Sequence, residues 1–119
     1  MFHVKHSQKG THIMPTIHHN KIVRDKIPEI IQSTGGTPNL RRLTTDESIT
    51  ALETKLQEEL NEYLADHSLE ELADLTEVIR GILHHKNLTW NDLETVRQQK
   101  YADRGGFEGG TYLVSVEKE

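Results

Sequence analysis

The chain has 119 residues, which is enough for one domain with a modest core but too short for two. Its formal net charge of −5 argues against a nucleic-acid scaffold, and no apolar run approaches the length that spans a membrane. It contains no cysteine, so disulfides and thiol chemistry are excluded.

The start of the chain differs from the rest, because its first thirteen residues are polar, aperiodic and rich in histidine. We expect residues 1–13 to be a disordered N-terminal extension and residues 14–119 to form the domain, with Met14 as an alternative start. The N-terminus lacks the apolar core of a signal peptide, so we expect a cytoplasmic protein.

A basic, loop-like segment at residues 20–26 precedes a short predicted helix. Pro28 suits the first turn of that helix, which is expected to end at Gln32, ahead of a Gly-Gly pair. Residues 37–43 then have weak strand character.

Three longer helices are each predicted to begin with a capping box. In this motif a Ser or Thr side chain and an acidic side chain three residues later bond to each other's backbone N–H groups. The three pairs are Thr44 with Glu47, Ser68 with Glu71, and Thr89 with Asp92. The helices that follow them are expected to end near residues 65, 84 and 102.

Residues 111–116 alternate between apolar and polar side chains, which predicts a short strand. It can pair with residues 37–43 into a ribbon that needs helices beneath it for stability. The predicted fold class is therefore an all-α helical bundle with a small two-stranded β-ribbon. Because only 34% of the residues are hydrophobic, we expect part of the core to form across a subunit interface.

Two acidic motifs lie on consecutive predicted helices. The first, EELNE, starts at Glu58, and the second, ELAD, starts at Glu71. Acids three residues apart lie on one side of a helix, so Glu59 and Glu62 can converge with Glu71 and Asp74 if the helices pack antiparallel. Converging carboxylates stay ionised only around a cation, and oxygen ligands select a hard one. We therefore expect Mg²⁺, with Mn²⁺ as an alternative.

Helical phase places these acids near apolar side chains. Glu71 falls inside the apolar arc of its helix with Asp74 beside it, whereas Glu59 lies at the edge of a stripe and Glu58 faces solvent. A carboxylate in an apolar arc needs compensation, since burying an unpaired charge costs several kcal/mol. Acid runs on helices are usually solvated surfaces, however, and Glu71 also completes a capping box.

EExxE at residues 58–62, followed by ExxD on the next helix, resembles the signature of the MazG-like superfamily of all-α nucleoside triphosphate pyrophosphohydrolases. Residues 20–29 resemble the "NKLVRDKIPE" segment of a small subgroup that is labelled phosphoribosyl-ATP pyrophosphohydrolase-like. Lys100, with the RGGF sequence that starts at Arg104, resembles its C-terminal element. The resemblance covers roughly residues 17–117.

The resemblance implies Mg²⁺-dependent hydrolysis of a nucleoside triphosphate to the monophosphate and pyrophosphate, as house-cleaning of the nucleotide pool. It maps the metal ligands to Glu59, Glu62, Glu71 and Asp74, and the catalytic carboxylates to Glu58 and Glu59. The triphosphate also needs cations, and the candidates are Lys21, Arg24, Lys26, Lys55, Lys100 and Arg104. We expect a homodimer or a dimer of dimers, with no nucleic-acid or membrane partner.

Three alternatives remain open at the level of the sequence. The subgroup label suggests phosphoribosyl-ATP pyrophosphohydrolysis, although no further sequence feature favours it. A non-catalytic nucleotide-binding module would keep the acids without turnover. A purely structural helical dimer would use the acids as surface charge, and the position of Glu71 inside an apolar arc argues against it.

Overall fold

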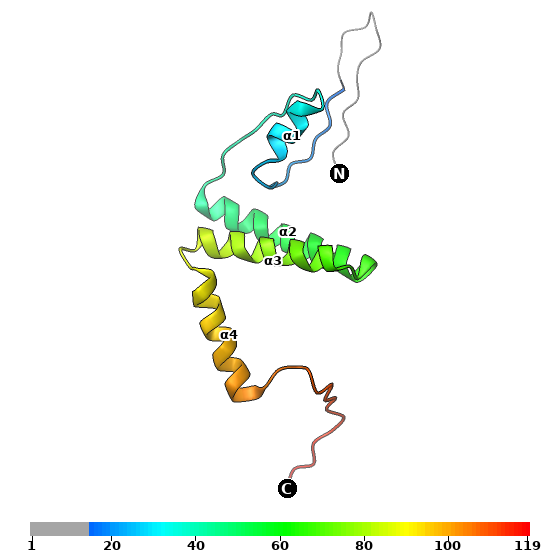
Figure 1. The fold of residues 1–119 in the computed structure, drawn as a ribbon, viewed down its shortest axis with the longest axis vertical. Helices are drawn as coiled ribbons and strands as arrows, with labels where there is room; N and C mark the ends of the chain where they lie inside the picture. Colours follow the sequence, from blue (N-terminus) through cyan, green and yellow to red (C-terminus); the bar gives the residue numbers. More distant parts are fainter. Residues whose placement is uncertain (1–14) are drawn as a thin grey trace, which may run out of the picture.

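The structure is a computed structural model that describes residues 15–119, and this part of the chain is all-α. Its four helices are α1 (Ile27–Ser33), α2 (Thr45–Asp66), α3 (Leu69–His85) and α4 (Trp90–Arg104) (Figure 1). The all-α class is therefore confirmed. The predicted disordered extension at residues 1–13 lies outside the described residues.

The helix starts follow the caps that the sequence predicts. Thr44 accepts a bond from the Glu47 N–H at 3.2 Å, and its own N–H donates to the Glu47 carboxylate at 3.0 Å. Thr89 and Asp92 form the same reciprocal pair at the start of α4. Ser68 caps α3 through the Glu71 N–H at 3.3 Å, but no bond returns from the Glu71 side chain.

Helices α2 and α3 form an antiparallel pair, and within residues 15–119 no other two helices pack extensively. His67 reverses the chain between them in a left-handed conformation, with φ of 58°. Leu52, Val78 and Leu83 are buried in this pair. A Cβ on Gly81 would lie 3.2 Å from a Leu52 methyl carbon, so the absence of a side chain there lets the two helices approach closely.

Outside the α2–α3 pair, the described residues do not pack into a compact body. The radius of gyration is 20.7 Å, against about 13 Å for a compact domain of this length. Helix α4 leaves the α2–α3 pair, and the C-terminal segment continues away from it (Figure 1). Many large apolar side chains are consequently exposed; they include Leu60, Leu64, Leu72, Phe107, Tyr112, Leu113 and Val114.

The predicted β-ribbon is not present. Within residues 15–119 no segment is a strand, and residues 37–43 and 111–116 lie toward opposite ends of the molecule (Figure 1). Alternation identifies segments that can be strands, but it does not specify a pairing partner. Here α4 carries the second segment away from the first, so neither meets the partner or the helical support that a ribbon needs.

Among the described residues, no helix combines the length and the apolar character that crossing a membrane requires.

Candidate metal centre

Carboxylates of α2 and α3 meet near the turn that joins the two helices. Oxygen atoms of Glu59, Glu71 and Asp74 all lie within 4.8 Å of one another, and those of Glu58, Glu59 and Glu62 form a second such group. Glu59 belongs to both groups. The antiparallel pairing therefore brings the two acidic motifs together, as their spacing predicts. We call these five residues the acidic cluster.

Glu59 is the most buried member of the acidic cluster, with only 6% of its surface exposed. Its Oε1 lies 3.6 Å from Lys55 Nζ, one helical turn away, while its Oε2 is buried and has no hydrogen-bond partner among residues 15–119. Burial, followed by the adjacent Glu62 carboxyl, raises the pKa of Glu59 to about 7, although nearby Lys55 lowers it. Without another cation, ionising this group is therefore unfavourable.

Glu71 is half-buried and also has an oxygen, Oε2, without a hydrogen-bond partner. Burial, followed by the charges of Glu62 and Asp74, raises the pKa of Glu71. A buried acceptor without a partner is rare in folded proteins. Two of them from facing helices fit a divalent cation, because carboxylate oxygens are the ligands that Mg²⁺ prefers.

The order of burial differs from the prediction, which placed Glu71 deeper than Glu59. In the structure α2 turns its Glu59 side toward α3 and the N-terminal segment. As a result, Leu60 and Leu64 of the predicted apolar stripe are 39% and 58% exposed. Helical phase predicts which residues of α2 share the apolar stripe, but it carries no information on whether another element of the same chain covers them.

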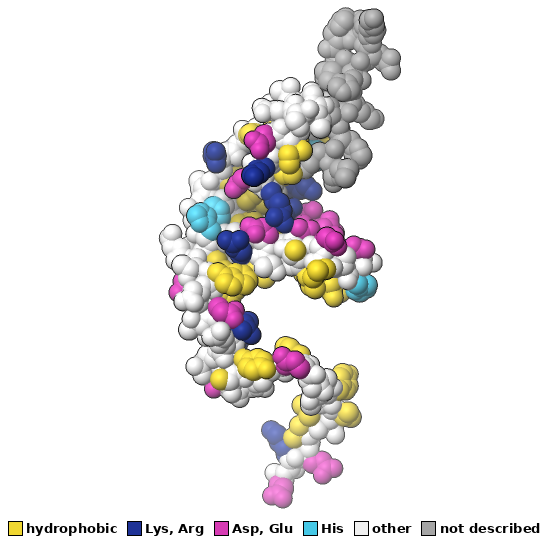
Figure 2. All heavy atoms as spheres, viewed as in Figure 1, with side chains coloured by type: hydrophobic (Ala, Val, Ile, Leu, Met, Phe, Trp, Pro, Cys, Tyr) yellow, Lys and Arg dark blue, Asp and Glu magenta, His cyan; other side chains and the backbone are white. Residues whose placement is uncertain are grey.

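Basic side chains lie against the acidic cluster. Lys21 Nζ is 3.4 Å from Glu58 Oε1, and Arg24 Nη2 is 2.6 Å from Asp74 Oδ1. Figure 2 shows Lys and Arg side chains beside the acids over the α2–α3 pair. Glu58, which was predicted to face solvent, is half-buried and paired. No local feature of the sequence indicates either contact, since the partners are 37 and 50 residues apart.

Three predicted phosphate-binding residues stand apart from the cluster. Lys26 lies at the start of α1, and its side chain makes no hydrogen bond or ion pair with the described residues. Lys100 and Arg104 lie near the end of α4 (Figure 1). Helix α4 leaves the α2–α3 pair at the end away from the turn, whereas the acidic cluster lies near the turn. One copy of the chain therefore brings Lys21, Arg24 and Lys55 to the acids.

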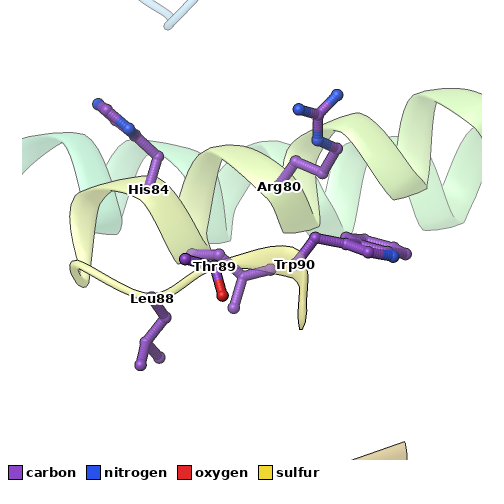
Figure 3. Close-up of a pocket in the computed structure, with 6 residues that line it drawn as sticks. Arg80, His84, Leu88, Thr89 and Trp90 are labelled. Carbon is purple, nitrogen blue, oxygen red and sulfur yellow. The ribbon is translucent and has the colours of Figure 1, made fainter. Parts of the chain in front are cut away.

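Two shallow pockets flank the helix pair. One of about 120 Å³, between residues 20–22 and α2, is lined by Lys55 and Glu58 and so adjoins the cluster. The other, of about 190 Å³, lies at the corner between α3 and α4 (Figure 3). Its lining residues are Arg80, Leu83, His84, Leu88, Thr89 and Trp90. Neither reaches the roughly 300–1,000 Å³ of typical small-molecule sites.

Comparison with known proteins gives one partial match. A stretch of 45 residues, 38% of the chain, is 49% identical to an uncharacterized protein of Mycolicibacterium smegmatis (strain ATCC 700084 / mc(2)155). The match covers 46% of that protein, so the chain spans less than half the length of this curated relative. No family model and no solved structure matches the chain.

Proposed function

We propose that the chain is a MazG-like, Mg²⁺-dependent nucleoside triphosphate pyrophosphohydrolase that removes unwanted nucleotides. The observation that carries the proposal is the buried Glu59 carboxylate, which has an oxygen without a partner and lies within 4.8 Å of Glu71 and Asp74 oxygens. Its support from the sequence is the order of the EExxE, ExxD and RGGF motifs. Mn²⁺ has the same preference for oxygen ligands and is expected to substitute.

Glu59, Glu62, Glu71 and Asp74 would hold the metal, which when bound neutralises phosphate charge and lowers the pKa of a bound water. Glu58, half-buried at the edge of the cluster, would accept the proton of the attacking water. The bond between the α-phosphate and the β-phosphate breaks, and pyrophosphate leaves with the bonding electron pair.

The cations beside the cluster would bind the substrate. Lys21, Arg24 and Lys55 each lie within 4 Å of an acid of the cluster, so a triphosphate bound there would meet them. Arg can make two parallel bonds to a phosphate, whereas Lys acts as a point charge.

The products of one turnover test this reaction. We expect incubation with Mg²⁺ and a panel of NTPs, dNTPs and phosphoribosyl-ATP to yield a monophosphate and pyrophosphate from at least one substrate. Separation of the products by ion-exchange chromatography identifies them. Exclusive turnover of phosphoribosyl-ATP would instead assign the alternative activity, phosphoribosyl-ATP pyrophosphohydrolysis. A diphosphate with orthophosphate, or nucleotide binding without any turnover, would contradict pyrophosphohydrolysis.

A homo-oligomer, either a homodimer or a dimer of dimers, is the second part of the proposal. One copy exposes Leu64, Leu72 and almost all of Phe107, which is 99% exposed, and the pocket that adjoins the cluster, at about 120 Å³, is smaller than typical small-molecule sites. We take these exposed apolar side chains as surface that another copy covers. In such an assembly the Lys100 and Arg104 of another copy could reach the triphosphate.

Light scattering coupled to gel filtration checks the assembly. We expect wild-type protein to elute with at least twice the 13.7 kDa mass of the chain. Leu64→Glu places a charge in the exposed apolar surface and should lower that mass at micromolar concentration, since burying an unpaired charge is unfavourable. Gln57→Glu adds the same charge at an exposed polar position of α2 and is the control. A wild-type monomer would contradict the proposed assembly.

A further inference from the structure

The acidic cluster already has counter-ions supplied by the chain itself. Asp74 pairs with Arg24 at 2.6 Å, Glu58 with Lys21 at 3.4 Å, and Glu59 with Lys55 at 3.6 Å. Lys55 belongs to α2 and lies one turn from its partner. The other two cations come from residues 20–26, a segment outside the helix pair that carries the acids.

This basic segment is held against the helices by more than charge. Ile22 and Val23, between the two cations, are half-buried, and Ile22 lies in the pocket next to Ala51 of α2. The Arg24 carbonyl accepts a bond from the Ile27 N–H at 3.0 Å, which connects the segment to the start of α1. The side chains of Lys21 and Arg24 are therefore anchored beside the cluster but remain about half exposed, at 41% and 54%.

A divalent cation needs the same oxygens. Mg²⁺ binds carboxylate oxygens at about 2.0–2.1 Å. Because Arg24 Nη2 lies 2.6 Å from Asp74 Oδ1, a metal on that carboxylate would face a positive guanidinium a few ångströms away. Like charges at that separation repel, and partial burial strengthens the repulsion. The buried, unpartnered Glu59 Oε2 shows that the two cations leave the centre of the cluster unsatisfied.

We infer that Lys21 and Arg24 are internal counter-ions that compete with the metal for the acidic cluster. In the metal-free protein they stabilise the carboxylates, and on metal binding Arg24 leaves Asp74 and becomes free to bind a phosphate of the substrate. The inference rests on the metal site of the proposed function. It adds that Lys21 and Arg24 weaken metal binding and strengthen substrate binding.

Calorimetric titration of the full chain with Mn²⁺, without nucleotide, measures this competition. Arg24→Gln is expected to bind Mn²⁺ about two- to five-fold more tightly than wild type, the size of effect that loss of an exposed ion pair gives. Without metal, the same variant should have a lower melting temperature. Mn²⁺ should then raise that temperature by more in the variant than in wild type.

Arg80→Gln is the matched control. Arg80 also pairs with an acid on α3, Glu77 at 3.6 Å, and its loss changes the net charge by the same amount. It lies six residues beyond Asp74, which is about 9 Å along a helix, and charges at that distance are largely screened at physiological salt. We expect its Mn²⁺ affinity to equal that of wild type.

The outcomes separate this inference from the proposed function. If wild type binds Mn²⁺ and Arg24→Gln binds it equally or more weakly, the competition is wrong while the metal site stands. Weaker binding would mean that Arg24 orients Asp74 for the metal. If wild type binds no Mn²⁺, the metal site and the competition both fail. Should Arg24→Gln not fold, Lys21→Gln provides the same comparison at the Glu58 pair, with tighter binding expected.

Discussion

Asp74→Asn is expected to lower kcat/KM for nucleotide hydrolysis by about 10³-fold, because a ligating carboxylate supports a metal that stabilises the transition state by several kcal/mol. Helical content should stay near that of wild type, since Asp74 is not in the apolar core of the α2–α3 pair. Steady-state kinetics and far-UV circular dichroism measure the two quantities.

The control for this variant is Glu77→Gln, three residues further along α3. Glu77 is exposed and, among residues 15–119, pairs only with Arg80 on its own helix, so its loss should change kcat/KM by less than about two-fold. If Asp74→Asn retained activity within a few-fold of wild type, Asp74 could not be a metal ligand, and the assignment of the acidic cluster would have to be revised.

Glu59→Gln is expected to have opposite effects on activity and stability. The kcat/KM should fall at least about 100-fold, because a positioned acid–base group usually contributes at least that much. The variant also loses a proposed metal ligand. Stability of the metal-free protein at pH 8 should rise by an amount on the order of 1–3 kcal/mol, because the variant removes a charge that is buried among other acids. Thermal or urea unfolding with a chelator present measures this change.

The pH dependence of stability tests the same feature. The folded state raises the pKa of Glu59 from 4.5 to about 7, so between these values the folded protein holds the proton more tightly than the unfolded chain. This contribution to stability is fully present below pH 4.5 and is lost as the pH rises through about 7. The stability gain of Glu59→Gln should therefore disappear near pH 4.

Glu53→Gln, at an exposed position on the same helix, controls for the loss of one negative charge and should leave the pH profile unchanged. A Glu59→Gln variant that was destabilised at pH 8, and less so at pH 4, would show that Glu59 acts through its ionised pair with Lys55. The raised pKa would then have no part in the stability.

Local features of the sequence predicted the part of the site that lies on the helices. A capping box is complete within four residues, so Thr44 and Thr89 identified the starts of α2 and α4 correctly. The i, i+3 spacing of the acids together with a short turn is enough to bring both motifs to one end of the helix pair.

Predictions failed, or were not made, where a feature depends on contacts between residues far apart in the sequence. The β-ribbon is not present, because no segment within residues 15–119 is a strand. The pairs of Lys21 with Glu58 and of Arg24 with Asp74 join residues tens of positions apart, and periodicity carries no information at that range. The capping box at Ser68 lacks the bond from the Ser68 N–H to the Glu71 side chain. The Glu71 carboxylate lies in the acidic cluster, which is a contact with another helix and not a local one.

The two-residue turn between α2 and α3 also bears on the order of folding. The contacts next to the turn join positions close in the chain, and such local contacts form in microseconds to milliseconds because little loop entropy is lost. Pairing can therefore start at the turn and extend toward Leu52 and Gly81. The proposed association of copies would instead be bimolecular and would slow on dilution. The hairpin that carries the acids is thus expected to be complete in a newly made chain before a second copy arrives.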